Sequence, residues 1–174
     1  GHAIRREPFL RKPEVRQEGD AARPQLPVQP AHVVCYPAAH PRQRQVAERK
    51  MNVKFFIAGD GPRKDEIARI ISEKKLQDVV AMLGYREDTP QILSALDIFL
   101  FTSYANEGVP QAVLQALAME KGVVGTDTGG VAEAVLDGKT GLLVKPRDTA
   151  GMLAGVLKLI EDEPLRRSCG TAGR

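Results

Sequence analysis

The stretch of sequence best suited to chemistry is the polar loop 102–110, Thr-Ser-Tyr-Ala-Asn-Glu-Gly-Val-Pro. It follows an apolar run typical of a buried strand and leads into a segment typical of a helix. The first turn of a helix presents unpaired N–H groups and a partial positive charge, which favour a bound anion. Gly108 lets the backbone approach a ligand closely, and Pro110 suits a helix start. Glu107 can accept hydrogen bonds from ligand hydroxyl groups, although the helix dipole favours a carboxylate there in any case.

The elements around this loop alternate between short apolar runs and amphipathic segments. The apolar runs predict strands at 53–58, 79–83, 98–101, 122–126 and 141–144. The segments between them predict helices at 63–75, 89–96, 111–119, 131–136 and 152–160, and a further helix opening near residue 164. The pattern predicts an α/β fold, a Rossmann-like parallel sheet with helices on both faces. Ligands of such sheets bind at the carboxyl ends of the strands.

Residues 1–50 differ from the rest in composition. They hold seven of the 12 prolines, and 10 Lys and Arg against 5 Asp and Glu, whereas residues 51–174 hold 15 against 17. Proline opposes both helix and sheet, so we expect residues 1–50 to be disordered or loosely attached, with residues 51–174 forming the domain. Only residues 31–36 suggest a short strand. The basic excess lacks interleaved aromatic residues and helical periodicity, which argues against a partner of nucleic acid or anionic lipid.

Cysteine and histidine usage disfavours several classes of site. Cys35 and Cys169, the two cysteines, are too few and too far apart for a disulfide framework or a zinc site. All three histidines precede residue 51, so we expect neither a histidine base nor a metal site in residues 51–174. No apolar run is long enough to span a membrane, and the first residues do not resemble a secretory signal.

Five sequence blocks, in order and spacing, resemble the group-one (family-four) retaining glycosyltransferases across about residues 53–168. The central block begins Glu-Gly-Val-Pro-Gln at residue 107 and resembles the family pattern of a Glu followed, after seven residues, by a second Glu. The other blocks lie at 57–62, which includes Gly59, at 83–85, at 123–135 and at 137–148. The resemblance implies that the chain is the C-terminal, donor-binding half of a GT-B fold.

The resemblance also implies roles for individual residues. Glu107 would contact the donor sugar, and the backbone N–H groups of Gly108, Val109 and Gln111 would face the sugar and the diphosphate. The second Glu of the family binds ribose, and here Gln115 stands in its place, so that contact is expected to be weaker. The family places the base near Tyr85 and Arg86. Each of these residues also has an ordinary structural interpretation, as a loop carboxylate, a surface helix residue or a packing residue.

The parent reaction implied by the resemblance transfers a hexose from UDP- or GDP-sugar with retention and without a required metal. The acceptor would be a glycan or lipid of the cell envelope, bound through an N-terminal domain that this chain lacks. The resemblance suggests a cytoplasmic protein and leaves open a peripheral contact with the inner face of the membrane in the full-length protein.

Two departures from the family favour an alternative, a non-catalytic nucleotide-binding module or an inactive fragment. Residues 1–50 show no counterpart of the basic loop that neutralises the diphosphate, which suggests that they are not homologous to the domain. Compared with the family, we also expect the acceptor domain to be missing from this chain and the last helix to be truncated. An epimerase of the same fold fits the blocks less well, and a dinucleotide-binding domain fits poorly because the third glycine of its fingerprint is missing after Gly59.

Overall fold

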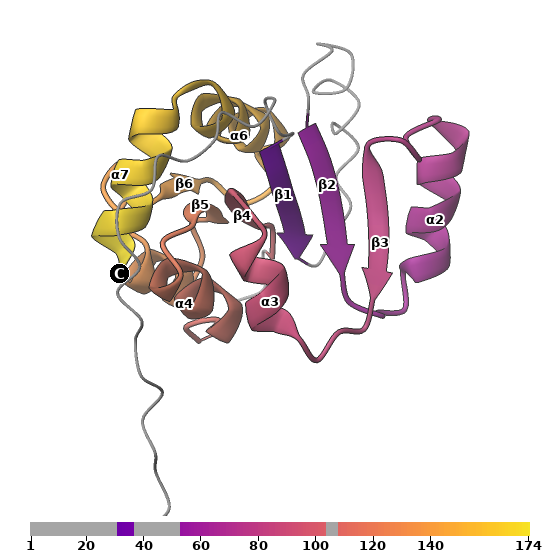
Figure 1. Cartoon of the computed structure of the whole chain (residues 1–174), viewed down its shortest axis with the longest axis horizontal. Coiled ribbons are helices and arrows are strands. Elements are labelled where there is room, and N and C mark those ends of the chain that lie inside the picture. The colour runs from indigo at the N-terminus through magenta and orange to yellow at the C-terminus, as the bar shows by residue number, and fades with distance from the viewer. Residues whose placement is uncertain (1–30, 37–52, 104–107) are drawn as a thin grey trace, which may run out of the picture.

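The computed structural model describes the backbone of residues 31–36 and the whole of residues 53–103 and 108–174. These residues form one six-stranded sheet (Figure 1) in which every pairing is parallel. The strands are β1 (Ala31–Tyr36), β2 (Val53–Ala58), β3 (Val80–Gly84), β4 (Ile98–Phe101), β5 (Gly122–Thr126) and β6 (Leu142–Val144). Their spatial order is β3-β2-β1-β4-β5-β6, the order of a Rossmann fold. The predicted fold class is therefore confirmed.

Strand β1 occupies the middle of the sheet, where it pairs with β2 on one side and β4 on the other. The predicted domain boundary at residue 51 therefore leaves out a central strand. Pro30 and Pro37 flank residues 31–36 in the sequence, and β1 itself contains no proline that would remove a hydrogen bond from its interior. The strand suggested at residues 31–36 therefore forms with the same bounds, although the proline-rich composition of residues 1–50 led us to expect it outside the domain.

The helices lie close to their predicted positions, with ends shifted by a few residues. They are α2 (Lys64–Glu73), α3 (Thr89–Ser94), α4 (Gln111–Ala118), α5 (Gly130–Ala134), α6 (Thr149–Glu161) and α7 (Glu163–Gly173). Helix α6 begins earlier than predicted because the Asp148 carboxylate accepts a hydrogen bond of 2.8 Å from the Gly151 N–H. Asp162 caps α7 in the same way through the Leu165 N–H. In the described parts of the chain, no helix has the length and apolarity needed to cross a membrane.

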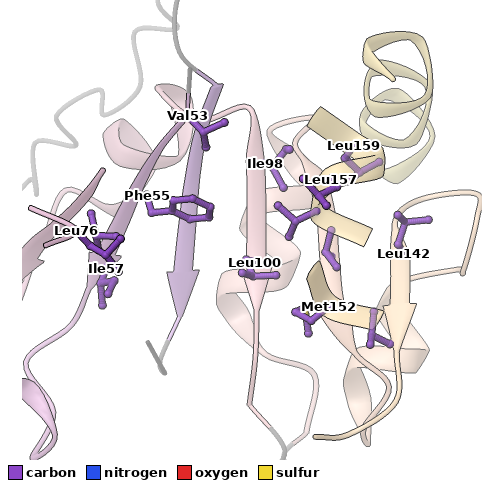
Figure 2. Close-up of a cluster of buried hydrophobic side chains, with 14 of the residues drawn as sticks. Val53, Phe55, Ile57, Leu76, Ile98, Leu100, Leu142, Met152, Leu157 and Leu159 are labelled. Carbon is purple, nitrogen blue, oxygen red and sulfur yellow. The ribbon is translucent and has the colours of Figure 1, made fainter. Parts of the chain in front are cut away.

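Two apolar clusters cover the two faces of the sheet. Alternate residues of β4 divide between them, with Ile98 and Leu100 in the first cluster and Phe99 and Phe101 in the second. The first cluster (Figure 2) joins the sheet to buried side chains of α2 and α6. The second cluster joins it to side chains from α3, α4 and α5. Burial on both faces explains why β4 and β5 are apolar or small throughout.

We predict that Ile98→Ala destabilises the domain by about 2–5 kcal/mol, because the side chain is fully buried and the cavity left behind cannot collapse. Urea unfolding followed by circular dichroism measures this loss. The control is Leu114→Ala, which removes a side chain that is 43% exposed and should cost less than about 1 kcal/mol. Equal losses for the two variants would contradict the described position of β4.

Candidate functional site

A pocket of about 370 Å³ opens where the carboxyl ends of β2, β3 and β4 meet helices α3 and α4. It brings together five residues that were predicted as site residues, Gly59, Tyr85, Arg86, Gln111 and Gln115. The remaining lining residues are Ala58, Thr89, Ile92, Leu93, Phe99, Phe101, Pro110 and Ala112. The pocket is therefore apolar at its base, where Phe99 and Phe101 belong to the core, and polar at its rim.

Two other predicted site residues that the structure describes are not part of this lining. Gly108 and Val109 are exposed and lead into α4. Glu107 lies outside the described residues, so its predicted contact with a donor sugar stays a prediction.

The wall of the pocket at the ends of β2 and β3 is made by main chain. The Gly59 N–H donates a 2.8 Å hydrogen bond to the Gly84 carbonyl, and the register between the two strands shifts between Ile57 and Ala58. Gly59 has a φ of 131° and Gly84 a φ of 66°. Residues with a side chain adopt such backbone angles only at an energetic cost, whereas glycine does so readily. The two glycines thus end both strands beside the pocket, and Gly59 lines it without adding a side chain.

Helix α4 presents its amino end to the pocket. Its N-cap residue is Pro110, and no side chain caps it. The N–H groups of a first helical turn have no partner within the helix, so they favour an anion. Gln111 and Gln115 are one turn apart on the same side of α4 and are both exposed. The side-chain amide of Gln115 can donate one hydrogen bond and accept another from a ligand.

The opposite rim of the pocket carries Tyr85 and Arg86. The Tyr85 side chain is 71% exposed. The Arg86 guanidinium donates two hydrogen bonds to the Asp88 carboxylate, from Nε to Oδ1 at 2.7 Å and from Nη2 to Oδ2 at 2.5 Å. This pairing lowers the pKa of Asp88 and raises the pKa of Arg86, so both groups remain charged around neutral pH.

The loops after β4 and β5 are in close contact. Gly130, the first residue of α5, lies against the backbone of Gly108 and Val109, and a Cβ built on Gly130 would overlap the Val109 nitrogen and lie 2.6 Å from its Cα. The loop that precedes α4 therefore rests on the start of α5, and only glycine fits at residue 130.

Sequence reasoning missed the contribution of α3 to the pocket. Thr89, Ile92 and Leu93 line it, and Asp88 holds Arg86. The available signal was the position of these residues directly after Tyr85 and Arg86, on the next element of the chain. Within residues 53–103 and 108–174, no group of three or more His, Cys, Asp or Glu side chains is placed to hold a metal ion.

Comparison with known proteins shows a match over most of the chain. The family model described as "Glycosyl transferases group 1" matches residues 31–162. The N-acetyl-alpha-D-glucosaminyl L-malate synthase of Bacillus anthracis is 30% identical over 125 residues, which are 72% of this chain and 32% of that protein. The chain thus spans about a third of the length of this curated relative. Because the family match starts at residue 31, part of the segment predicted to be unrelated to the domain lies within the match.

Solved structures show the same architecture. The Anabaena protein HepE in complex with UDP-glucose is 25% identical, with a TM-score of 0.71, and the similarity covers 83% of this chain and 43% of that one. The C-terminal domain of a group 1 family protein, LpcC, from Francisella tularensis is 21% identical, with a TM-score of 0.70 over 83% of this chain and 84% of that domain. The likeness to LpcC supports the prediction that the fold is the C-terminal half of a GT-B enzyme.

We predict that Gly130→Ala displaces the loop before α4 and destabilises the domain by about 1–3 kcal/mol, because the added methyl group overlaps backbone that must move. Hydrogen exchange at the amides of Val109 and Gln111 should accelerate. The control is Gly61→Ala, since a Cβ at Gly61 meets no atom within 4 Å and its backbone conformation accepts a side chain. Unchanged exchange at Val109 in Gly130→Ala would show that the two loops are not coupled.

Proposed function

The chain belongs to the group 1 glycosyltransferases, and we propose on this basis that its pocket binds the nucleotide part of a nucleotide-sugar donor. The observation that supports the proposal most strongly is the gathering of Gly59, Tyr85, Arg86, Gln111 and Gln115 from three separate stretches of sequence around one pocket. HepE, whose structure was solved with UDP-glucose, shares the fold of this chain.

Each part of a nucleotide diphosphate has a chemically suitable position in the proposed complex. The base lies between the Tyr85 and Arg86 rim and the apolar floor, where a flat ring can replace water. The ribose hydroxyls reach Gln115 on α4. The diphosphate lies at the amino end of α4, near the backbone N–H groups of Gln111 and of the Gly108–Val109 loop.

The proposed reaction of the whole protein is transfer of a hexose from UDP- or GDP-hexose, with retention, to a glycan or lipid acceptor. The nucleoside diphosphate leaves with negative charge, and N–H groups fixed at a helix start stabilise such charge without rearranging during the reaction. Glu107 is proposed to hold the sugar through its hydroxyl groups. No metal is required in this proposal, and the acceptor is bound by a second domain.

The alternative function is nucleotide binding without transfer. It is favoured by the neutral Gln115, because an amide makes weaker hydrogen bonds to ribose hydroxyls than the carboxylate of the family pattern. Donor turnover, measured with and without a complementing N-terminal half, separates the two functions. Transfer that appears only when the second half is added supports the glycosyltransferase proposal.

We predict that one of UDP, GDP and ADP stabilises the chain against thermal unfolding and that the others do so less. A ligand that binds only the folded state adds about 2.7 kcal/mol of stability at 100 times its dissociation constant. Thermal melts with each nucleotide at saturating concentration measure this. A chain that melts cooperatively but responds to none of the three would contradict the proposed donor site.

We predict that Gln115→Glu binds the preferred nucleoside diphosphate about fivefold more tightly, because a carboxylate makes stronger hydrogen bonds to ribose hydroxyls than an amide. Isothermal titration calorimetry measures the gain, which should shrink with the 2′-deoxy nucleotide. Gln77→Glu adds the same charge at an exposed residue that does not line the pocket and should leave the affinity unchanged. An equal gain in affinity with the 2′-deoxy nucleotide would contradict the proposed contact between Gln115 and ribose.

A further inference from the structure

The carboxylate of Asp88 has an unusual partner for its position in the chain. Asp88 is the N-cap residue of α3, where an aspartate side chain commonly accepts a hydrogen bond from the first helical turn. Here it makes no such bond, and both of its oxygens accept hydrogen bonds from Arg86. The Asp88 side chain therefore does not stabilise α3 as an N-cap.

The geometry of this pair fixes the plane of the guanidinium. Two hydrogen bonds of 2.7 and 2.5 Å, from two guanidinium nitrogens to the two carboxylate oxygens, hold both the position and the rotation of the group, which a single bond would not do. The Arg86 side chain is nonetheless 46% exposed, so a ligand can still reach it. An arginine side chain that is held in this way loses less freedom when a ligand binds.

Arg86 also stands between two cavities. Besides the main pocket, it lines an adjoining cavity of about 240 Å³, together with Phe56, Leu83, Ile92, Ala95 and Leu96. Arg86 and Ile92 are shared by the linings of both cavities. The orientation of the Arg86 side chain therefore determines where the main pocket ends on this side.

The charges of Arg86 and Asp88 favour binding of the nucleotide base at this rim over binding of the diphosphate. Asp88 offsets the positive charge of Arg86, which leaves the flat face of the guanidinium as its main binding surface. A flat, weakly hydrated cation of this kind stacks well on a neutral ring. The diphosphate is attracted instead to the amino end of α4, which no side chain of the described residues caps.

We propose that Asp88 is a positioning residue for the nucleotide base, which holds the Arg86 guanidinium in the plane that closes the main pocket against the adjoining cavity. The inference rests on the proposed function, because it takes a nucleoside diphosphate as the ligand. It adds a residue outside the pocket lining that controls base selectivity through Arg86.

The test measures the dissociation constants of UDP, GDP and ADP for the wild-type chain and for Asp88→Asn. The expected result is binding of the preferred nucleotide that is about fivefold weaker, with a smaller difference between it and the other two. Arg86→Lys should act similarly because it loses the two-pronged contact. The losses of Asp88→Asn and Arg86→Lys should not add in the double variant, since Asp88 acts through Arg86.

The chain contains a matched control pair. Arg63 donates two hydrogen bonds to Glu66, at 2.8 and 2.9 Å, on the exposed surface of the molecule and away from either cavity. Glu66→Gln removes the same kind of contact and should change neither the affinity nor the selectivity. Asp88→Glu keeps a carboxylate and should recover part of the lost selectivity.

Two results would overturn the inference. One is an equal loss of affinity for all three nucleotides together with a lower melting temperature, which is the behaviour of a structural residue. The other is unchanged binding in Asp88→Asn. A wild-type chain that binds no nucleotide would contradict the proposed function itself, so the two failures are distinguishable.

Discussion

The parallel pairing of β1 with both β2 and β4 is the interaction on which the site depends. It joins the β2–β3 half of the sheet to the β4–β6 half and sets all their carboxyl ends at one edge. Tyr85 and Arg86 come from the first half, and Gln111 and Gln115 come from the second. The pocket exists because β1 holds the two halves in register.

Backbone and side chains form different parts of the pocket at this edge of the sheet. The main chain forms the wall at Gly59, which Gly84 holds by a hydrogen bond, and main-chain N–H groups at the start of α4 provide the attraction for an anion. Side chains form the rim and the floor. The shape of the pocket is consequently fixed by glycines and strand ends, while its preference for one ligand depends on a few side chains such as Arg86 and Gln115.

Sequence reasoning was most successful where one signal dominates. The strands at 53–58, 98–101 and 122–126 form with the predicted bounds. A short apolar run between polar or glycine-rich turns is typical of a buried strand and of few other structures. The predicted residues of the main pocket also meet, since parallel strands must bring their following loops together. Strand β1 also forms at the suggested residues 31–36, but the prolines around it led us to place it outside the domain. The pairing of Asp88 with Arg86 was missed because the preference of aspartate for an N-cap predicts a different partner.

The central place of β1 also has a consequence for the order in which the chain folds. Val33 of β1 pairs with Ile98 of β4, so roughly 65 residues separate the two sides of this junction. The pairing of β1 with β2 spans far less sequence, with Ala31 opposite Val53. During synthesis β1, β2 and β3 leave the ribosome before β4, so the free side of β1 is an open edge until β4 follows. Until then, this edge is exposed to pairing with another copy of the chain.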